Sequence, residues 1–268
     1  MIATIFFLDT FTTKAFTGNP TPVCCSNSHL DKPVMQSIAA ELNLPVTAFV
    51  FKKEKASHYD IQYFTPITEI PACGHATLAA ARVLMQADNV SQLTFHTGRG
   101  LAIDAYLKDD AIMMSYPRYE WQKSDVAMET MKSLGIDTYK SAAFSPELET
   151  LFIELDNGDL LRKIQPDFIR LTNSSDHIKE VVITSAPDSP QYDYLLRSFC
   201  PWIGIDEDPV TGSVHSVLGP YWQQRSNKSN LTAYQASARG GVLLINAFDN
   251  RVDIGGHSVI IMKGEMSY

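Results

Sequence analysis

Two glycine-containing turns, each followed by an apolar helical stretch, constrain the fold of this chain more than any other feature. The first, Cys73–Thr77 (Cys-Gly-His-Ala-Thr), continues into the alanine-rich run Leu78–Met85. That run is apolar on nearly every side, and a helix of this kind is buried. The second turn, Asp208–Ser213 (Asp-Pro-Val-Thr-Gly-Ser), leads into another apolar stretch that reaches Trp222. Other elements must therefore wrap around two central helices.

Short strands separated by turn residues surround both predicted helices. Further helices are expected after Asp31 and at 125–134, the latter capped by Ser124. Each half thus has strands, a glycine-containing turn into an apolar helix, and an antiparallel meander, which suggests an internal duplication. The many short strands argue against a doubly wound parallel sheet. The strands are expected at 47–51, 59–64, 101–107, 111–116, 181–184 and 192–199, and as a series within 231–262.

Composition and charge narrow the classes of function. The 268 residues are 45% hydrophobic and 19% charged, as in ordinary globular proteins. A net charge of −8 makes nucleic acid or an anionic membrane an unexpected partner. There is no basic leader and no apolar run near the roughly 20 residues of a membrane helix, so a cytoplasmic protein is expected. The four cysteines show neither a zinc nor a disulfide pattern, so no metal is expected.

The chemistry is expected at the two helix entrances. A helix N-terminus offers free backbone N–H groups and partial positive charge, which together hold a carboxylate. His75 and Asp208 can each move protons beside such a ligand. Simpler interpretations stay open: Asp208 and Thr211 as ordinary N-caps, His75 as a core histidine, and Cys73 as a small buried hydrophobe. Neither turn is a phosphate-binding loop or a dinucleotide fingerprint, so nucleotide binding is not supported.

Five ordered motifs span nearly the whole chain: Leu8–Phe11 with Phe16–Pro20, Phe64–Pro66, Cys73–Thr77, Glu207–Ser213 and Gln235–Gly241. Together they resemble the PhzF-like (phenazine biosynthesis-like) proteins. The resemblance implies an α+β fold like that of diaminopimelate epimerase. Such a fold has two pseudo-symmetric domains, each a curved, mostly antiparallel sheet wrapped around a central helix, with the active site between them. The expected domains are 1–117 plus about 260–268, and 118–259.

The resemblance also implies a function. The family activity is isomerisation by proton transfer on a small cyclic amino acid, without metal or organic cofactor, commonly in a homodimer. Carried over by motif, His75 and Asp208 fall at catalytic positions, and Cys73 corresponds to a cysteine that serves as base in related racemases and epimerases. A small anionic metabolite is the expected partner. Its binding residues would be Asn19, Gly74, Ala76, Thr211, Gly212 and Ser213.

One departure from the family pattern concerns catalysis directly. The family usually reads Asn-Leu-Ser-Glu-Thr after its first helix, and the glutamate is the general acid/base. Here residues 43–47 read Asn-Leu-Pro-Val-Thr, so Val46 stands at the glutamate position and cannot carry a proton. A general base contributes about 10²–10⁴ in rate. Three outcomes are open: proton transfer by Asp208 with His75, use of Cys73 as the base, or a protein that binds a metabolite without turning it over.

Overall fold

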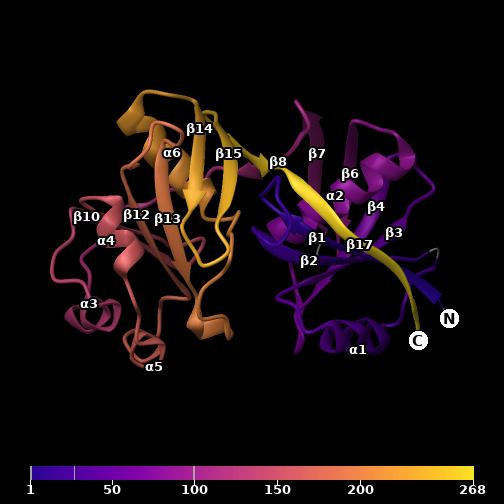
Figure 1. Cartoon of the computed structure of the whole chain (residues 1–268), viewed down its shortest axis with the longest axis horizontal. Coiled ribbons are helices and arrows are strands. Elements are labelled where there is room, and N and C mark those ends of the chain that lie inside the picture. The colour runs from indigo at the N-terminus through magenta and orange to yellow at the C-terminus, as the bar shows by residue number, and fades with distance from the viewer. Residues whose placement is uncertain (1, 27, 99) are drawn as a thin grey trace. The chain divides into compact units, whose positions relative to one another are not determined.

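The chain divides into two compact units. The computed structural model describes residues 2–26, 28–98 and 100–268. Unit 1 is Met1–Tyr116 with Asp253–Tyr268, and unit 2 is Pro117–Val252. The return to unit 1 therefore begins at Asp253, whereas the sequence led us to expect it near residue 260. Figure 1 shows the elements of each unit.

Unit 1 is a mixed sheet with two helices. Parallel pairing joins β2 to β3 and β4 to β6, while β1 to β2, β3 to β4, β6 to β7 and β7 to β8 are antiparallel. The C-terminal strand β17 completes the unit by running antiparallel to β1. The elements are β1 Ile2–Thr10, β2 Asn19–Ser26, α1 Lys32–Leu42, β3 Thr47–Lys52, β4 His58–Phe64, β5 Glu69–Ile70, α2 Gly74–Asp88, β6 Gln92–Thr97, β7 Ala102–Lys108, β8 Ala111–Pro117 and β17 Ser258–Ser267.

The two helices of unit 1 cover opposite faces of its sheet, because side chains alternate along each strand. Phe49 on β3 packs with Met35 and Ile38 of α1 in one core cluster. Tyr63 lies opposite Ala48 on the other face, where its hydroxyl reaches α2. Helix α2 contacts β1, β2, β3, β6 and β17, and almost all of its first three turns are buried. The alanine-rich helix is therefore central, as the sequence predicts.

Unit 2 repeats this order of elements. Strands β11 and β12 pair in parallel and are connected through α4 and α5, as β2 and β3 are connected through α1. Strands β13 and β14 pair in parallel and are connected through α6, as β4 and β6 are connected through α2. The expected internal duplication is thus present in the topology. The elements are β9 Gln122–Lys123, α3 Met128–Leu134, β10 Ser141–Ser145, β11 Thr150–Leu155, α4 Gly158–Lys163, α5 Phe168–Thr172, β12 Glu180–Ser185, β13 Tyr194–Phe199, the 3₁₀ turn Pro201–Ile203, α6 His215–Ser226, β14 Asn230–Gln235 and β15 Gly241–Ala247. Strand β16, Arg251–Gly256, begins in unit 2 and ends in unit 1.

Helix α6 tolerates a proline in its interior. Pro220 has no N–H, so the carbonyl of Ser216 loses its helical partner. The N–H of Tyr119 donates to that carbonyl at 3.1 Å and satisfies it. Gly219 allows close packing on the sheet, since a Cβ there would lie 2.8 Å from Ile245 Cγ2. The central helix of unit 2 is therefore fixed by contacts with its own unit.

Two predicted helix starts are wrong. Helix α3 begins at Met128, and Ser124 does not cap it: the Ser124 N–H donates to the Ala142 carbonyl, so this segment is held along the sheet. Helix α6 begins at His215, two residues beyond the end of the predicted turn at Ser213, because the residues before it form tighter i to i+3 bonds such as His215 N to Gly212 O at 3.1 Å.

Candidate functional site

The first helix entrance is rigid and has free backbone donors. Cys73 is the N-cap of α2 but makes no side-chain cap bond. The Thr77 hydroxyl donates to the Cys73 carbonyl at 2.7 Å and lies 2.6 Å from the Tyr63 hydroxyl. Among the described residues, the N–H groups of Gly74 and Ala76 have no acceptor. This arrangement can hold an anion at the N-terminus of a buried helix.

The half-buried Cys73 thiol and the buried His75 imidazole lie in contact. The Sγ atom is 3.5 Å from each ring nitrogen of His75. The side-chain amide of Asn19 donates to Nδ1 at 3.2 Å, which places the proton of the neutral ring on Nε2. A thiolate can accept that N–H, and a hydrogen bond to the charged form of a group favours that form. Cysteine, histidine and asparagine thus form one group within unit 1.

Asn19 reaches His75 because of the turn between β1 and β2. Gly18 has a φ of +71°, and a Cβ there would collide with the Thr10 carbonyl oxygen. The buried carboxylate of Asp9 accepts the N–H of Phe16 at 2.6 Å and holds the turn. A glycine is therefore required directly before the asparagine.

Val46, the residue that the sequence motif predicts at the position of the family glutamate, is an apolar group. Its side chain is buried, with 4% exposed. It directly precedes β3, and strand alternation puts it on the same face as Ala48, which lies opposite Tyr63. That face is the one covered by α2. The residue is therefore on the side of the sheet where Cys73 begins the helix, but it supplies no proton donor or acceptor.

Two tyrosines lie close enough to Cys73 to sense its charge. Burial raises the pKa of Tyr63 and of Tyr116 well above the usual range, and the nearby Cys73 raises both further. Both hydroxyls therefore stay protonated at neutral pH. The Tyr63 hydroxyl donates to the Thr77 hydroxyl, and the Tyr116 hydroxyl donates to the Met114 sulfur at 3.7 Å.

The second entrance holds Asp208 in a clamped loop. The Thr211 hydroxyl donates to the Asp208 carboxylate at 2.7 Å. The Gln235 side chain donates to the Asp208 carbonyl at 2.7 Å and accepts the Thr211 N–H at 2.8 Å. In the part of the chain that the structure describes, the N–H groups of Gly212, Ser213 and Val214 have no acceptor. An acid/base group thus stands beside three free donors.

These contacts overturn one simpler interpretation. Neither Asp208 nor Thr211 is the N-cap of α6, because Val214 occupies that position without a side-chain bond. The two side chains bind each other instead. The sequence did not assign a role to Gln235, although it lies in a motif shared with the family; its contacts with the loop come only from the tertiary structure.

Charged and buried groups surround the Asp208 loop. Arg197 makes a paired contact with Glu207, with Nε to Oε1 at 2.8 Å and Nη2 to Oε2 at 2.9 Å. Burial raises the pKa of Glu180 from 4.5 to about 7, and the negative Asp208 adds to this against the lowering effect of a hydrogen bond from Ser198. Of these two glutamates, Glu207 is paired with an arginine, whereas Glu180 has a raised pKa.

A second histidine marks the N-terminus of α6 but belongs to the core. His215 is completely buried, and its Nδ1 lies 2.6 Å from the Tyr194 hydroxyl. Burial lowers its pKa to about 3, so the ring is neutral at physiological pH. Tyr194 in turn stacks on Trp222 with ring centroids 5.5 Å apart. His215 is therefore a structural histidine of the core of unit 2.

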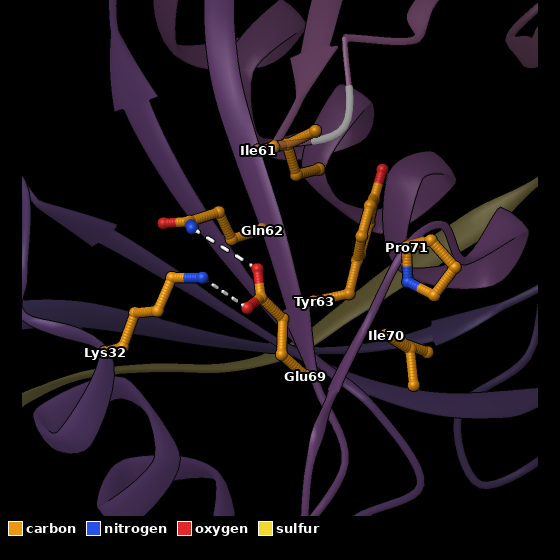
Figure 2. A pocket seen from close by; sticks show the side chains of 8 residues that line it. Lys32, Ile61, Gln62, Tyr63, Glu69, Ile70 and Pro71 are labelled. Carbon is orange, nitrogen blue, oxygen red and sulfur yellow. Dashed lines mark hydrogen bonds and ion pairs between the residues drawn. The ribbon is translucent and has the colours of Figure 1, made fainter.

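A cavity of about 280 Å³ in unit 1 lies beside the segment that leads to Cys73. Glu69 accepts from Lys32 at 2.7 Å and from Gln62 at 3.5 Å on its wall, and Ile70 lies next to them (Figure 2). None of the sequence-predicted site residues lines this cavity. Within the described ranges, no helix is long and apolar enough to cross a bilayer. No three His, Cys, Asp or Glu side chains among those residues are grouped to hold a metal ion.

Comparison with known proteins places the sequence in a family. The sequence model of the phenazine biosynthesis-like proteins matches residues 8–264. The chain belongs to this family. It is 36% identical to an uncharacterized isomerase of Halalkalibacterium halodurans, over 99% of both proteins. It is also 36% identical to the mouse phenazine biosynthesis-like domain-containing protein 2, over 98% of each.

Solved structures confirm the fold class expected from the motifs. A PhzF-family protein of Enterococcus faecalis matches with a TM-score of 0.93 and 36% identity, over 100% of both chains. A hydroxyproline epimerase of Agrobacterium vitis with bound trans-4-hydroxy-L-proline matches with a TM-score of 0.60 and 10% identity, over 98% of this chain and 92% of that one. The second likeness shows a shared fold alone. The α+β fold of two pseudo-symmetric epimerase-like domains is thus confirmed.

Proposed function

We propose that this protein is an isomerase that moves a proton on a small carboxylate metabolite, with Cys73, His75 and Asp208 as the catalytic groups. The contact between the Cys73 thiol and the His75 ring, at 3.5 Å, carries the proposal. It offers a proton acceptor at the entrance where the family glutamate is replaced by Val46. Relatives that are named isomerases agree with this class of reaction.

The proposed reaction needs no oxidant or reductant. The Cys73 thiolate takes the proton from the carbon next to the substrate carboxylate, and the electron pair of that bond moves into an enediolate. Asp208 is the group that returns a proton to carbon, and it takes up a replacement proton from solvent. The free N–H groups of Gly74 and Ala76 and those of Gly212 and Ser213 stabilise the negative charge, as oxyanion donors do. Asn19 would orient His75 at the first entrance, and Thr211 would orient Asp208 at the second.

Deuterium incorporation from heavy water tests the proposal. We would incubate a panel of small carboxylates, including L-proline and trans-4-hydroxy-L-proline, and detect exchange by mass spectrometry. Cys73→Ser and Asp208→Asn should each lower the exchange rate by about 10²–10⁴. Asp249→Asn changes an exposed aspartate and should leave the rate unchanged. Unchanged exchange in Cys73→Ser and Asp208→Asn would refute the assignment.

A non-catalytic metabolite-binding protein is the second candidate, and the buried Val46 favours it. The discriminating variant is Val46→Glu. If it exchanges substrate protons while the parent binds the same carboxylate without exchange, the binding function is correct. Exchange by the parent protein excludes it. A thermal-shift screen of carboxylates identifies the ligand for either case, because a bound ligand raises the melting temperature.

A further inference from the structure

Gln235 makes an unusual contact with the loop that carries Asp208. It is the last residue of β14, and none of its surface is exposed. Its side-chain Nε2 donates to the Asp208 carbonyl at 2.7 Å, and its Oε1 accepts the Thr211 N–H at 2.8 Å. Both ends of one primary amide are therefore used on the same four-residue loop.

The Gln235 amide bridges the first carbonyl and the fourth N–H of the loop from Asp208 to Thr211, the two groups that bind each other directly in a closed β-turn. In a closed turn the first carbonyl accepts the N–H of the fourth residue directly, and proline is favoured at the second position. Pro209 stands at that position, but the Gln235 amide lies between the two backbone groups. The turn is thus wider by one amide group than a closed turn would be.

The open turn lies between the Asp208 carboxylate and the N–H groups of residues 212–214. The Thr211 N–H is taken by Gln235, and the three following N–H groups, from Gly212 to Val214, are left for a ligand. The Asp208 carboxylate, at the start of the turn, accepts a hydrogen bond from the Thr211 hydroxyl at its end. The width of the turn therefore sets the distance between the carboxylate and these donors.

We propose that Gln235 is a positioning residue that holds the Asp208 turn open and thereby sets the spacing between the Asp208 carboxylate and the anion-binding N–H groups. This rests on the proposed function of that entrance. A second contact supports it: the Ser237 hydroxyl donates to the Pro209 carbonyl at 2.6 Å. The strand end and the turn after it thus fix the loop at three backbone groups.

The test compares crystal structures of the full chain with those of Gln235→Met and Gln235→Glu. Methionine has a similar shape but no hydrogen-bonding group, so two buried backbone groups lose their partners, which is costly. We expect the turn to close in this variant, with an Asp208 O to Thr211 N distance of about 3 Å. A loop that keeps its open form in Gln235→Met overturns the proposal. Gln223→Met, which removes a glutamine contact at the far end of α6, is the matched control and should leave the turn open.

A titration with acetate gives a readout that does not depend on turnover. In ¹⁵N spectra of the wild type, acetate should shift the amide signals of Gly212, Ser213 and Val214. Those shifts should be lost in Gln235→Met, whereas the shifts of Gly74 and Ala76 in the other unit should persist. Equal responses at the second entrance in both proteins overturn the proposal. A wild type that shows no acetate response there refutes the proposed anion site instead, and the crystal structures still decide whether the glutamine positions the turn.

The Gln235→Glu variant separates positioning from mere packing. Its introduced carboxyl group keeps one donor and one acceptor when protonated, while the ionised form loses the donor. With any carboxylate that the wild type exchanges, Gln235→Glu should approach the wild-type rate at low pH. At high pH it should fall about 10²-fold, as expected for a misplacement of about 1 Å. The predicted loss should appear in kcat more than in KM. A rate ratio to wild type that is independent of pH contradicts the proposal.

Discussion

Replacing Glu180 by glutamine should make the protein more stable at alkaline pH. Glu180 starts β12, and its carboxylate accepts hydrogen bonds from the hydroxyls of Ser198 and Thr150, the latter at 3.2 Å. Burial, together with the charge of Asp208, raises its pKa from 4.5 to about 7. Glutamine fits the same site, because serine and threonine hydroxyls can accept as well as donate.

The size of the effect follows from the pKa. A group whose pKa is higher in the folded than in the unfolded state stabilises the fold fully below the unfolded pKa, and this stabilisation is lost as pH rises through the folded pKa. For Glu180 that window runs from 4.5 to about 7. One pKa unit corresponds to about 1.4 kcal/mol, so the wild type should lose about 3 kcal/mol across the window from this group.

Urea unfolding at pH 5 and at pH 8 measures this loss. The unfolding free energy of wild type should fall relative to that of Glu180→Gln between pH 5 and pH 8. The fall should be up to about 3 kcal/mol. Glu120→Gln changes an exposed carboxylate and serves as the control. A carbon-detected titration of the Glu180 carboxyl should have its midpoint near 7. A change between the two pH values below about 0.5 kcal/mol, or of opposite sign, would refute the reasoning, since the predicted loss is several times larger.

Three further changes test the framework of the two entrances by calorimetric melting. Gly18→Ala should cost at least about 2 kcal/mol, because the backbone is left-handed and the added Cβ would collide with the Thr10 carbonyl. Gly100→Ala should cost less, since φ is +80° there but no atom lies within 4 Å of the added Cβ; equal costs would contradict the collision. Glu207→Ala should cost about 3 kcal/mol because it leaves Arg197, a residue only 9% exposed, without its carboxylate partner; a neutral effect would show that the pair does not hold the loop. Phe16→Asn should stabilise by about 0.5–1 kcal/mol, since the phenylalanine has a φ of +69° and is 78% exposed; a lower melting temperature would mean that the ring has a packing role.

The sequence by itself predicted the local features of this protein well. The alanine-rich run is a central helix because its apolar residues cover the whole circumference. Most strands lie where alternation and turn residues predict them. The starts of α3 and α6 were wrong, because residues such as Ser124 and Gly212 make hydrogen bonds that favour a strand-like or a tighter local conformation over a regular helix.

Which side chains meet was decided only by the tertiary structure. Asn19 and His75 are 56 positions apart, and their contact depends on the turn at Gly18 and on the pairing of β1 with β2. Gln235 reaches the Asp208 turn because β14 lies beside β13 in a parallel pair. Periodicity reports only whether a position is buried, while long-range strand pairing decides which distant residues become its neighbours. The sequence therefore determined the two helix entrances, and the fold determined the partners of their side chains.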